Sequence, residues 1–286
     1  MLRSGNDSAV CLAEATCGTI SAFADKMNEK AKELHLSHTH FESPHGLDSN
    51  GHYTTAYELA ILTDYALKNS IFAQIVGTKT ATITINGYSK TLSNTNELLG
   101  NLDGVYGVKT GFTNGANRCL VTACKRGDMD IICVVLGCDT KKFRTQDSIK
   151  LIEYAFNSYE YVNIAEKISK ELDNWKTNNL NSFLIEKGKK QYLDFSYKEL
   201  ENKIIPIEKS AIGNIKINIC INTHLNAPIY ENDKVGYISV TANNKLISNC
   251  DIIANETVEK KGVFYYLFYF LKNYDTIFQN NLETLL

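Results

Sequence analysis

Lys109, Thr110 and Gly111 are consecutive residues whose side chains suit the binding of an extended peptide with an anionic end. Lys109 supplies a positive field, Thr110 can donate a hydrogen bond to a carboxylate, and Gly111 lets another backbone approach closely. The valines and aromatics around them favour a strand. On a strand, Thr110 points away from Lys109 and Gly111 unless a local twist turns its hydroxyl inward. A Lys-Thr-Gly triplet by itself more often marks a turn, so its meaning depends on a second group.

Three further polar groups each have two interpretations. Ser4 and Asn6 lie in a polar turn that either takes part in a site or only caps the following helix. Arg144 either binds a carboxylate or is a solvated residue in the first turn of a helix. The third group comprises His38, His40, His45 and Asp48, whose side chains suggest a metal site. Because the sequence contains no His-Glu-x-x-His helix, the interpretation as a loop fixed by hydrogen bonds is favoured. Neither a metal nor a cofactor is expected.

The elements that must position these residues begin with helices and continue as an antiparallel sheet. Apolar residues at helical spacing predict helices over 7–16 and from residue 20 onward, the second capped by Thr19. A capping box of Thr55 and Glu58 opens a third helix, which runs to Lys68. A hairpin over 81–88, with Asn86-Gly87 as its turn, precedes the Lys-Thr-Gly strand. Two more strands, 119–125 and 130–136, and a helix over 143–156 complete an α+β domain, expected over 1–160.

After about Tyr161 the sequence changes to polar stretches and short strand-like segments. This change marks a domain boundary and predicts a small all-β domain over 161–258. Isoleucines alternate with polar residues over 215–221, the period of a half-buried strand, and the pattern continues to about residue 247. The tail, 259–286, opens with an aromatic run that is too short to span a bilayer, which needs roughly 20 residues. It predicts either an interfacial helix on a membrane surface over 262–274 or a helix that covers its own domain.

Composition limits the function classes. The 286 residues carry a net charge of −2, which gives no electrostatic footprint for nucleic acid, so we expect no nucleic-acid partner. The eight cysteines contain no Cys-x-x-Cys pair, and their apolar neighbours predict buried, reduced thiols; the alternative is one disulfide within 119–138. The first residues lack the apolar core of a signal peptide, so no export signal is expected.

The order of the two motifs gives the chain a family resemblance. Ser4-Gly5-Asn6 and Lys109-Thr110-Gly111 resemble the Ser-x-Asn and Lys-Thr-Gly motifs of serine penicillin-binding enzymes. Further segments resemble the D-alanyl-D-alanine carboxypeptidases of low molecular mass and their carboxy-terminal β domain. They are residues 27–34, 39–41, 44–47, 107–113, 227–229, 233–236 and 252–254.

This resemblance implies a partial penicillin-binding/β-lactamase-like domain, then the β domain and an aromatic carboxy-terminal helix. It implies removal of the terminal D-Ala from peptidoglycan pentapeptide stems through an acyl-enzyme, and it implies that the intact enzyme also binds β-lactams. It further implies that the protein lies outside the cytoplasmic membrane and is associated with that membrane. Ser4 would pass a proton to the leaving amine and Asn6 would hold the substrate amide or a catalytic lysine. Lys109 would add positive potential beside the close approach at Gly111, while Thr110 and Arg144 would bind the terminal carboxylate. The Phe112 N–H would form half of the oxyanion hole.

One family motif is absent from the sequence. Ser-x-x-Lys, which holds the nucleophile and its base, occurs nowhere in the 286 residues. We therefore expect a chain that lacks the amino-terminal part of the family and is inactive alone. The alternative is a non-catalytic peptidoglycan-binding or partner-binding remnant. A β-lactamase fits less well because of the long β domain. A further hypothesis is that the chain is unstable by itself.

Overall fold

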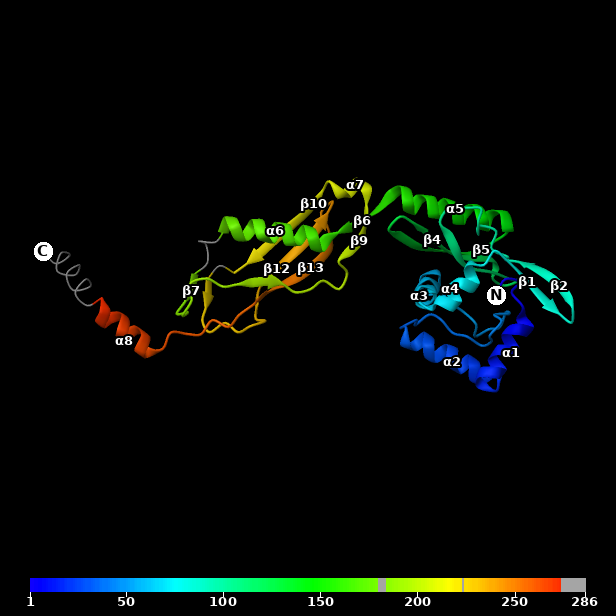
Figure 1. Cartoon of the computed structure of the whole chain (residues 1–286), viewed down its shortest axis with the longest axis horizontal. Coiled ribbons are helices and arrows are strands. Elements are labelled where there is room, and N and C mark those ends of the chain that lie inside the picture. The colour runs from blue at the N-terminus through cyan, green and yellow to red at the C-terminus, as the bar shows by residue number, and fades with distance from the viewer. Residues whose placement is uncertain (180–183, 223, 274–286) are drawn as a thin grey trace. The chain divides into compact units, whose positions relative to one another are not determined.

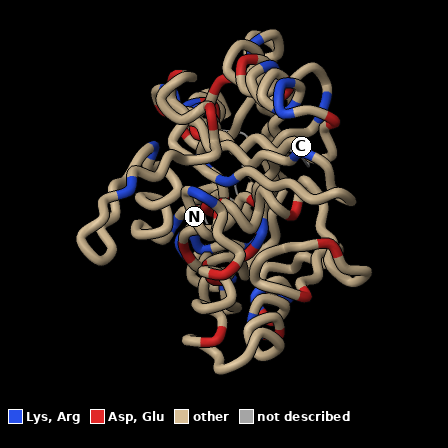
Figure 2. Tube along the Cα trace, turned by 90° about the vertical axis from the view of Figure 1, so that its right-hand side faces the viewer, with Lys and Arg blue, Asp and Glu red and all other residues tan. Residues whose placement is uncertain are grey.

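The computed structural model describes residues 1–179, 184–222 and 224–273 (Figure 1). It divides into two compact units, Met1–Tyr159 and Glu160–Leu286, and each is described by itself. Basic and acidic residues are interspersed along the trace, in keeping with the near-zero net charge (Figure 2).

The first unit contains helices, a hairpin and a three-stranded sheet in the expected order. Its helices are α1 (Asn6–Cys17), α2 (Ile20–Glu33), α3 (Ala56–Leu67), α4 (Ser70–Gly77) and α5 (Lys141–Ser158). Its strands are β1 (Thr80–Ile85), β2 (Tyr88–Ser93), β3 (Val105–Thr113), β4 (Asn117–Arg126) and β5 (Met129–Cys138). The predicted Thr19 cap is confirmed, because its side chain accepts a hydrogen bond from the Ala22 N–H at 3.1 Å.

The hairpin β1–β2 forms through the predicted turn. Asn86 and Gly87 both have positive φ, 51° and 81°, which a type I′ turn requires at its two central positions. The strands pair from Thr80 with Ser93 to Ile85 with Tyr88. Cross-strand hydroxyl pairs occupy one face of the hairpin.

The main sheet has the order β3-β4-β5, all antiparallel, with helices on both faces. Helix α5 packs on β4 and β5 over a core that includes Leu120 and Ile152, 1% and 0% exposed. Helices α3 and α4 contact the sheet through a second core that includes Val76 and Val108. Burial on both faces fixes the register of β3, the strand that carries Lys-Thr-Gly.

The predicted capping box is only half formed. The Thr55 hydroxyl accepts from the Glu58 N–H at 3.2 Å, as expected. The Glu58 carboxylate does not return to Thr55, because it accepts from the His38 N–H at 2.9 Å and from the Thr39 hydroxyl. Glu58 is 6% exposed, and its buried carboxylate is satisfied by these two hydrogen bonds. They fix the start of the loop between α2 and α3.

The described residues of the second unit are mainly β, as expected, and they include three helices. Its strands are β6 (Tyr159–Asn163), β7 (Leu184–Glu186), β8 (Phe195–Tyr197), β9 (Ile204–Glu208), β10 (Ile215–Ile221), β11 (His224–Asn226), β12 (Lys234–Ala242) and β13 (Lys245–Ala254). Its helices are α6 (Ile164–Asn179), α7 (Lys209–Ile212) and α8 (Val263–Lys272). The largest sheet has the order β10-β12-β13-β8.

Helix α6 is a difference from the all-β expectation for this unit. It buries Ile164, Ile168 and Leu172, which are spaced four residues apart and join the core under the large sheet. Such spacing places them on one face of a helix. Its many Lys, Glu and Asn residues lie on the solvent side, and they make the segment resemble a polar connection.

The expectation of buried cysteines is wrong for six of the eight. All eight are free thiols, but only Cys124 and Cys133 are buried, while Cys11 and Cys220 are exposed. Burial raises the pKa of the Cys133 thiol to about 11, so it behaves as a small apolar residue.

None of the helices in the described ranges is both long and apolar enough to cross a bilayer.

Candidate active site

The site is built around a hydrogen bond between the two predicted motifs. The Lys109 ammonium donates to the Ser4 hydroxyl at 2.7 Å, although the residues are 105 positions apart. Lys109 also donates to the Thr110 carbonyl at 2.6 Å. Burial lowers the pKa of the Lys109 ammonium below its ordinary value, because desolvation disfavours the charged form.

The structure shows no capping role for the Ser4 side chain. Gly5 is the N-cap residue of α1 and provides no side-chain hydrogen bond. Ser4 has a positive φ of 55°, and its hydroxyl pairs with Lys109 instead. Asn6 is the first residue of α1 and is exposed, so its amide remains accessible to solvent beside Ser4.

Thr110 and the loop before β3 form the next part of the site. The Thr110 and Thr95 hydroxyls lie 2.6 Å apart and share a hydrogen bond. The adjacent Asn96 is 2% exposed and donates to the Gly107 carbonyl at 2.9 Å, which fixes this loop against β3. The Thr95 N–H also donates to the Leu2 carbonyl at 3.1 Å, two residues before Ser4. The loop therefore holds both motif segments.

Arg144 lies in the first turn of α5, as predicted, but it is 3% exposed, so the solvated interpretation is wrong. Its Nε and Nη2 atoms are buried without a hydrogen-bond partner among the described residues. The nearest carboxylate is Glu97, whose Oε2 lies 3.7 Å from Nη2. Burial lowers the pKa of the guanidinium, and Glu97 partly offsets this effect. A buried cation with unused donors is well suited to an incoming carboxylate.

Arg144 and Thr110 are linked through one short loop. Thr95 contacts Thr110, and Glu97, two residues later, lies beside Arg144. The loop over residues 95–97 therefore contacts both Thr110 and Arg144. That these two residues bind one ligand stays a prediction.

Strand β3 presents an edge beside these groups. It is the first strand of the order β3-β4-β5, and no other strand in the described ranges pairs with its outer side. An outer edge carries alternating N–H and C=O groups that an extended peptide can use. Gly111 and Phe112 lie on this strand and are exposed; the Phe112 ring stacks on the Arg118 guanidinium at 3.8 Å.

The histidine-rich loop is held by separate hydrogen bonds, and its residues do not converge. His40 Nδ1 lies 2.6 Å from the Gly51 carbonyl, and Asn28 pairs with the backbone of Phe41 in both directions. Within the described residues no group of three or more His, Cys, Asp or Glu could hold a metal ion. Asp48 instead accepts from the Gly115 N–H at 3.0 Å, which ties the loop to the turn after β3.

Family models match both units of this chain. Residues 1–140 match the model of D-alanyl-D-alanine carboxypeptidase, and residues 180–260 match that of the carboxy-terminal domain of penicillin-binding protein 5. The D-alanyl-D-alanine carboxypeptidase DacF of Bacillus subtilis is 31% identical over 267 residues, which cover 93% of this chain and 66% of DacF. The chain belongs to the D-alanyl-D-alanine carboxypeptidase family.

Solved structures agree with this membership. The D-alanyl-D-alanine carboxypeptidase DacD of Francisella tularensis is 26% identical, with a TM-score of 0.70 over 91% of this chain and 73% of that one. Penicillin-binding protein 5 of Haemophilus influenzae is 25% identical, with a TM-score of 0.67 over 90% and 72%. This chain spans just under two thirds of the length of the first curated relatives, 66% of DacF and 65% of DacD of Escherichia coli.

Sequence reasoning missed two residues that organise this site, Thr95 and Glu97, which contact Thr110 and Arg144, respectively. Asp48 lies in the loop that the sequence predicts to be fixed by hydrogen bonds, and its bond from the Gly115 N–H agrees with that prediction. The signal for Thr95 and Glu97 is weak: Asn94 and Asn96 are typical of a polar turn before an apolar pair, but a turn does not reveal its tertiary partners.

Glu97 is held by two neighbours from α5. The Thr145 hydroxyl donates to Glu97 Oε2 at 3.1 Å, and Lys141 forms an ion pair with Oε1. Burial acts to raise the pKa of the Glu97 carboxyl, but the bonds from Lys141 and Thr145 outweigh it and hold the pKa below its usual range. A carboxylate with a depressed pKa stabilises the fold above its unfolded pKa, and this stability is lost as the pH falls through the folded value.

We expect Glu97→Gln to destabilise the chain at pH 7 by about 1 kcal/mol; this small value reflects solvent screening of a side chain that is 40% exposed. As the pH falls from the unfolded value of 4.5 through the lower folded value, wild type and variant should converge. Thermal unfolding followed by circular dichroism at several pH values measures both effects. Glu14→Gln, at an exposed position of α1, is the control. A stability difference that does not change with pH would contradict the role of the Glu97 charge.

Proposed function

We propose that this chain carries the substrate-binding residues and the proton relay of a serine-type D-alanyl-D-alanine carboxypeptidase. Its substrate would be the pentapeptide stem of peptidoglycan, from which it removes the terminal D-Ala. The observation that carries the proposal is the hydrogen bond from Lys109 to Ser4, because it brings together the two motifs of the family. An ammonium beside a hydroxyl favours the passage of a proton through that hydroxyl.

The substrate would lie extended along the outer edge of β3. Thr110 and Arg144 would bind its terminal carboxylate, since the Arg144 guanidinium is buried with unused donors. Lys109 would add positive potential beside them. Gly111 would let the peptide backbone approach, because the nearest atom to an added Cβ there is Cys119 Cβ at 3.5 Å and the outer side stays open.

The reaction would be an acyl transfer in two steps. A serine hydroxyl attacks the carbonyl carbon between the two D-alanines and gives its proton to the base of the Ser-x-x-Lys motif. The carbon–nitrogen bond then breaks, and this proton reaches the leaving amine through the Ser4 hydroxyl. Water then hydrolyses the acyl-enzyme. Asn6 would hold the substrate amide, and the Phe112 N–H would stabilise the oxyanion. Because Ser-x-x-Lys occurs nowhere in the 286 residues, the proposal places the nucleophile in sequence outside them.

The test is release of D-Ala by the complete gene product, which includes whatever sequence flanks these residues. A pentapeptide ending in D-Ala-D-Ala should release D-Ala, whereas the same peptide with a carboxy-terminal amide should react far more slowly, because Thr110 and Arg144 lose their anion. Pre-treatment with a β-lactam should block release. Absence of D-Ala release from the acid peptide would reject the proposal.

We further propose that this carboxypeptidase works outside the cytoplasmic membrane and that α8 lies on the membrane surface. Every residue of α8 is exposed; Val263 and Phe264 are 83% and 75% exposed, and Lys272 lies in its last turn. Aromatic rings next to lysines suit the headgroup region of a bilayer. Residues 274–286 of the predicted tail, which include the last residue of the 262–274 segment, lie outside the described residues.

The double change Phe264→Glu and Phe268→Glu should lower binding to vesicles of anionic phospholipid by about tenfold or more, because it places two charges among the headgroups. Co-sedimentation of the chain with vesicles measures this. Tyr88→Glu, at a residue of the hairpin that is 83% exposed, should leave vesicle binding unchanged. Equal binding by all three proteins would show that α8 does not contact the membrane.

A further inference from the structure

The second unit contains an apolar cavity that takes no part in the site described above. It has a volume of about 650 Å³ and lies between the end of α6 and residues 190–195. Three of its lining residues are aromatic: Trp175, Tyr192 and Phe195. The volume falls within the range of roughly 300–1,000 Å³ that is usual for small-molecule sites.

The aromatic residues provide the floor of the cavity. The rings of Trp175 and Phe195 meet edge to face with centroids 6.1 Å apart, and Phe195 is 3% exposed, so it forms part of the floor. Tyr192, which also lines the cavity, is 52% exposed. The face of an aromatic ring carries negative charge, which attracts weakly positive C–H groups.

The charged residues around the cavity are paired with one another. Lys176 lies 3.7 Å from Asp194, and Lys190 forms an ion pair with Glu256. The Asn255 amide donates to Asp194 at 3.0 Å. Two cations and two anions leave no net charge, so the rim attracts neither an anion nor a cation. A charged ligand would have to break these pairs, whereas an uncharged polar ligand would not.

We propose that this cavity binds an uncharged oligosaccharide, with the C–H face of a pyranose ring against Tyr192 and Trp175. The amides of Asn179 and Gln191, which also line the cavity, would pair with sugar hydroxyls. The inference rests on the proposed function, because the pentapeptide stems of peptidoglycan are attached to such a glycan. The second unit would then hold the sugar strand of the polymer whose peptide the first unit trims.

Trp175 makes the proposal directly measurable, since it is the only tryptophan of the 286 residues. The probe is the β-1,4-linked tetramer of N-acetylglucosamine, titrated into the chain while Trp175 fluorescence is recorded. We expect a saturable change in emission. Tyr192→Ala should weaken the apparent affinity by about tenfold, which is the loss of one ring contact.

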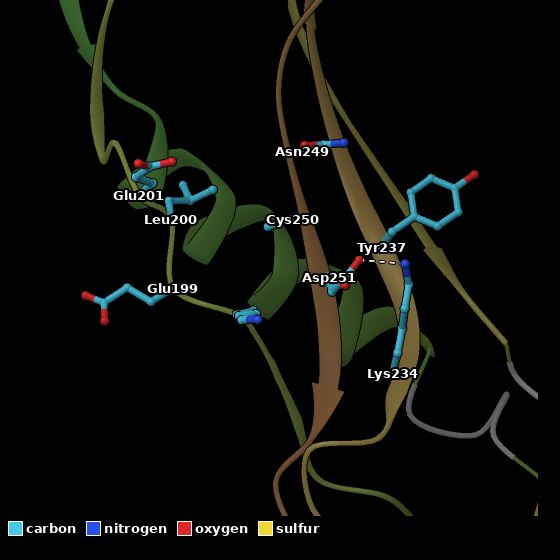
Figure 3. Close-up of a pocket in the computed structure, with 9 residues that line it drawn as sticks. Glu199, Leu200, Glu201, Lys234, Tyr237, Asn249, Cys250 and Asp251 are labelled. Atoms are coloured by element: carbon cyan, nitrogen blue, oxygen red, sulfur yellow. Dashed lines mark ion pairs between the residues drawn. The ribbon is translucent and has the colours of Figure 1, made fainter. Parts of the chain in front are cut away.

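The control is the same substitution elsewhere in the unit. Tyr237 is 48% exposed and lines a different hollow of about 360 Å³, which contains the ion pair of Lys234 with Asp251 at 2.6 Å (Figure 3). Tyr237→Ala should bind the tetramer as wild type does. An unchanged Trp175 emission maximum and melting temperature before titration establish that each variant is folded.

Three results would overturn the inference: no change in Trp175 emission with the tetramer, equal affinity in Tyr192→Ala, or an equal response to a charged peptide. Release of D-Ala from a soluble pentapeptide without sugar is measured in parallel on the complete gene product. Failure of sugar binding with D-Ala release intact would reject only this inference. Loss of D-Ala release would reject the proposed function, whatever the tetramer does.

Discussion

Replacing Lys109 by alanine should lower kcat/KM for D-Ala release by the complete gene product about 100-fold or more. The ammonium contacts Ser4 at 2.7 Å and lies next to the residues proposed to bind the carboxylate, so its loss affects both proton passage and substrate binding. Loss of one well-placed donor in a site that excludes water costs about 10²–10³ in rate. Initial rates with a D-Ala-D-Ala pentapeptide measure the change.

The pH profile separates the charge of Lys109 from a structural role. Because burial lowers its pKa, the ammonium is lost at a lower pH than for an ordinary lysine, and activity should fall early on the alkaline side. Lys109→Arg should retain part of the activity and move this alkaline limb to higher pH, since arginine stays charged. Lys142→Ala, at an exposed position of α5, should behave as wild type. An unchanged rate in Lys109→Ala would exclude Lys109 from the site.

Replacing Ile252 by alanine should destabilise the second unit by about 2–5 kcal/mol, because the removed methyl groups leave a cavity. Ile252 is 0% exposed and lies in β13, paired with Gly236 on one side and Tyr197 on the other. Trp175 packs against the same core, so urea unfolding followed by its fluorescence reports this unit alone.

Ile204→Ala is the matched change at an exposed position. Ile204 lies in β9 of the same unit and is 55% exposed, so its loss should cost less than about 1 kcal/mol. Similar urea midpoints for the two variants would show that Ile252 does not lie in the main core.

Most of the fold could be predicted from local patterns. The turn of Asn86 and Gly87, the Thr19 cap and the three strands around Lys-Thr-Gly all follow from residue chemistry within a few positions. Helix α6 was missed because its four-residue spacing of apolar groups is embedded among polar residues. Its assignment depends on a sheet that is formed about 50 residues later in the sequence.

The site was predictable only where a motif marks it. Motif order led us to expect Ser4 and Lys109 in one site, and the structure shows a hydrogen bond between them, yet nothing local indicates that Thr95 would meet Thr110. The burial of Arg144 likewise depends on how α5 packs on β4 and β5, so a position in the first helical turn could not distinguish a solvated residue from a buried one. The roles of these residues in catalysis remain predictions.

The separation of Ser4 and Lys109 by 105 positions also governs when a working site can exist during folding. Helices such as α1 and the hairpin β1–β2 depend on local contacts and can form early, whereas contacts distant in sequence form slowly. The Asp48 to Gly115 bond, 67 positions apart, adds a second late closure at the end of β3. A partly folded chain therefore has both motifs but no assembled site, and binding of a ligand between Ser4 and Lys109 would be a sign that folding of the first unit is complete.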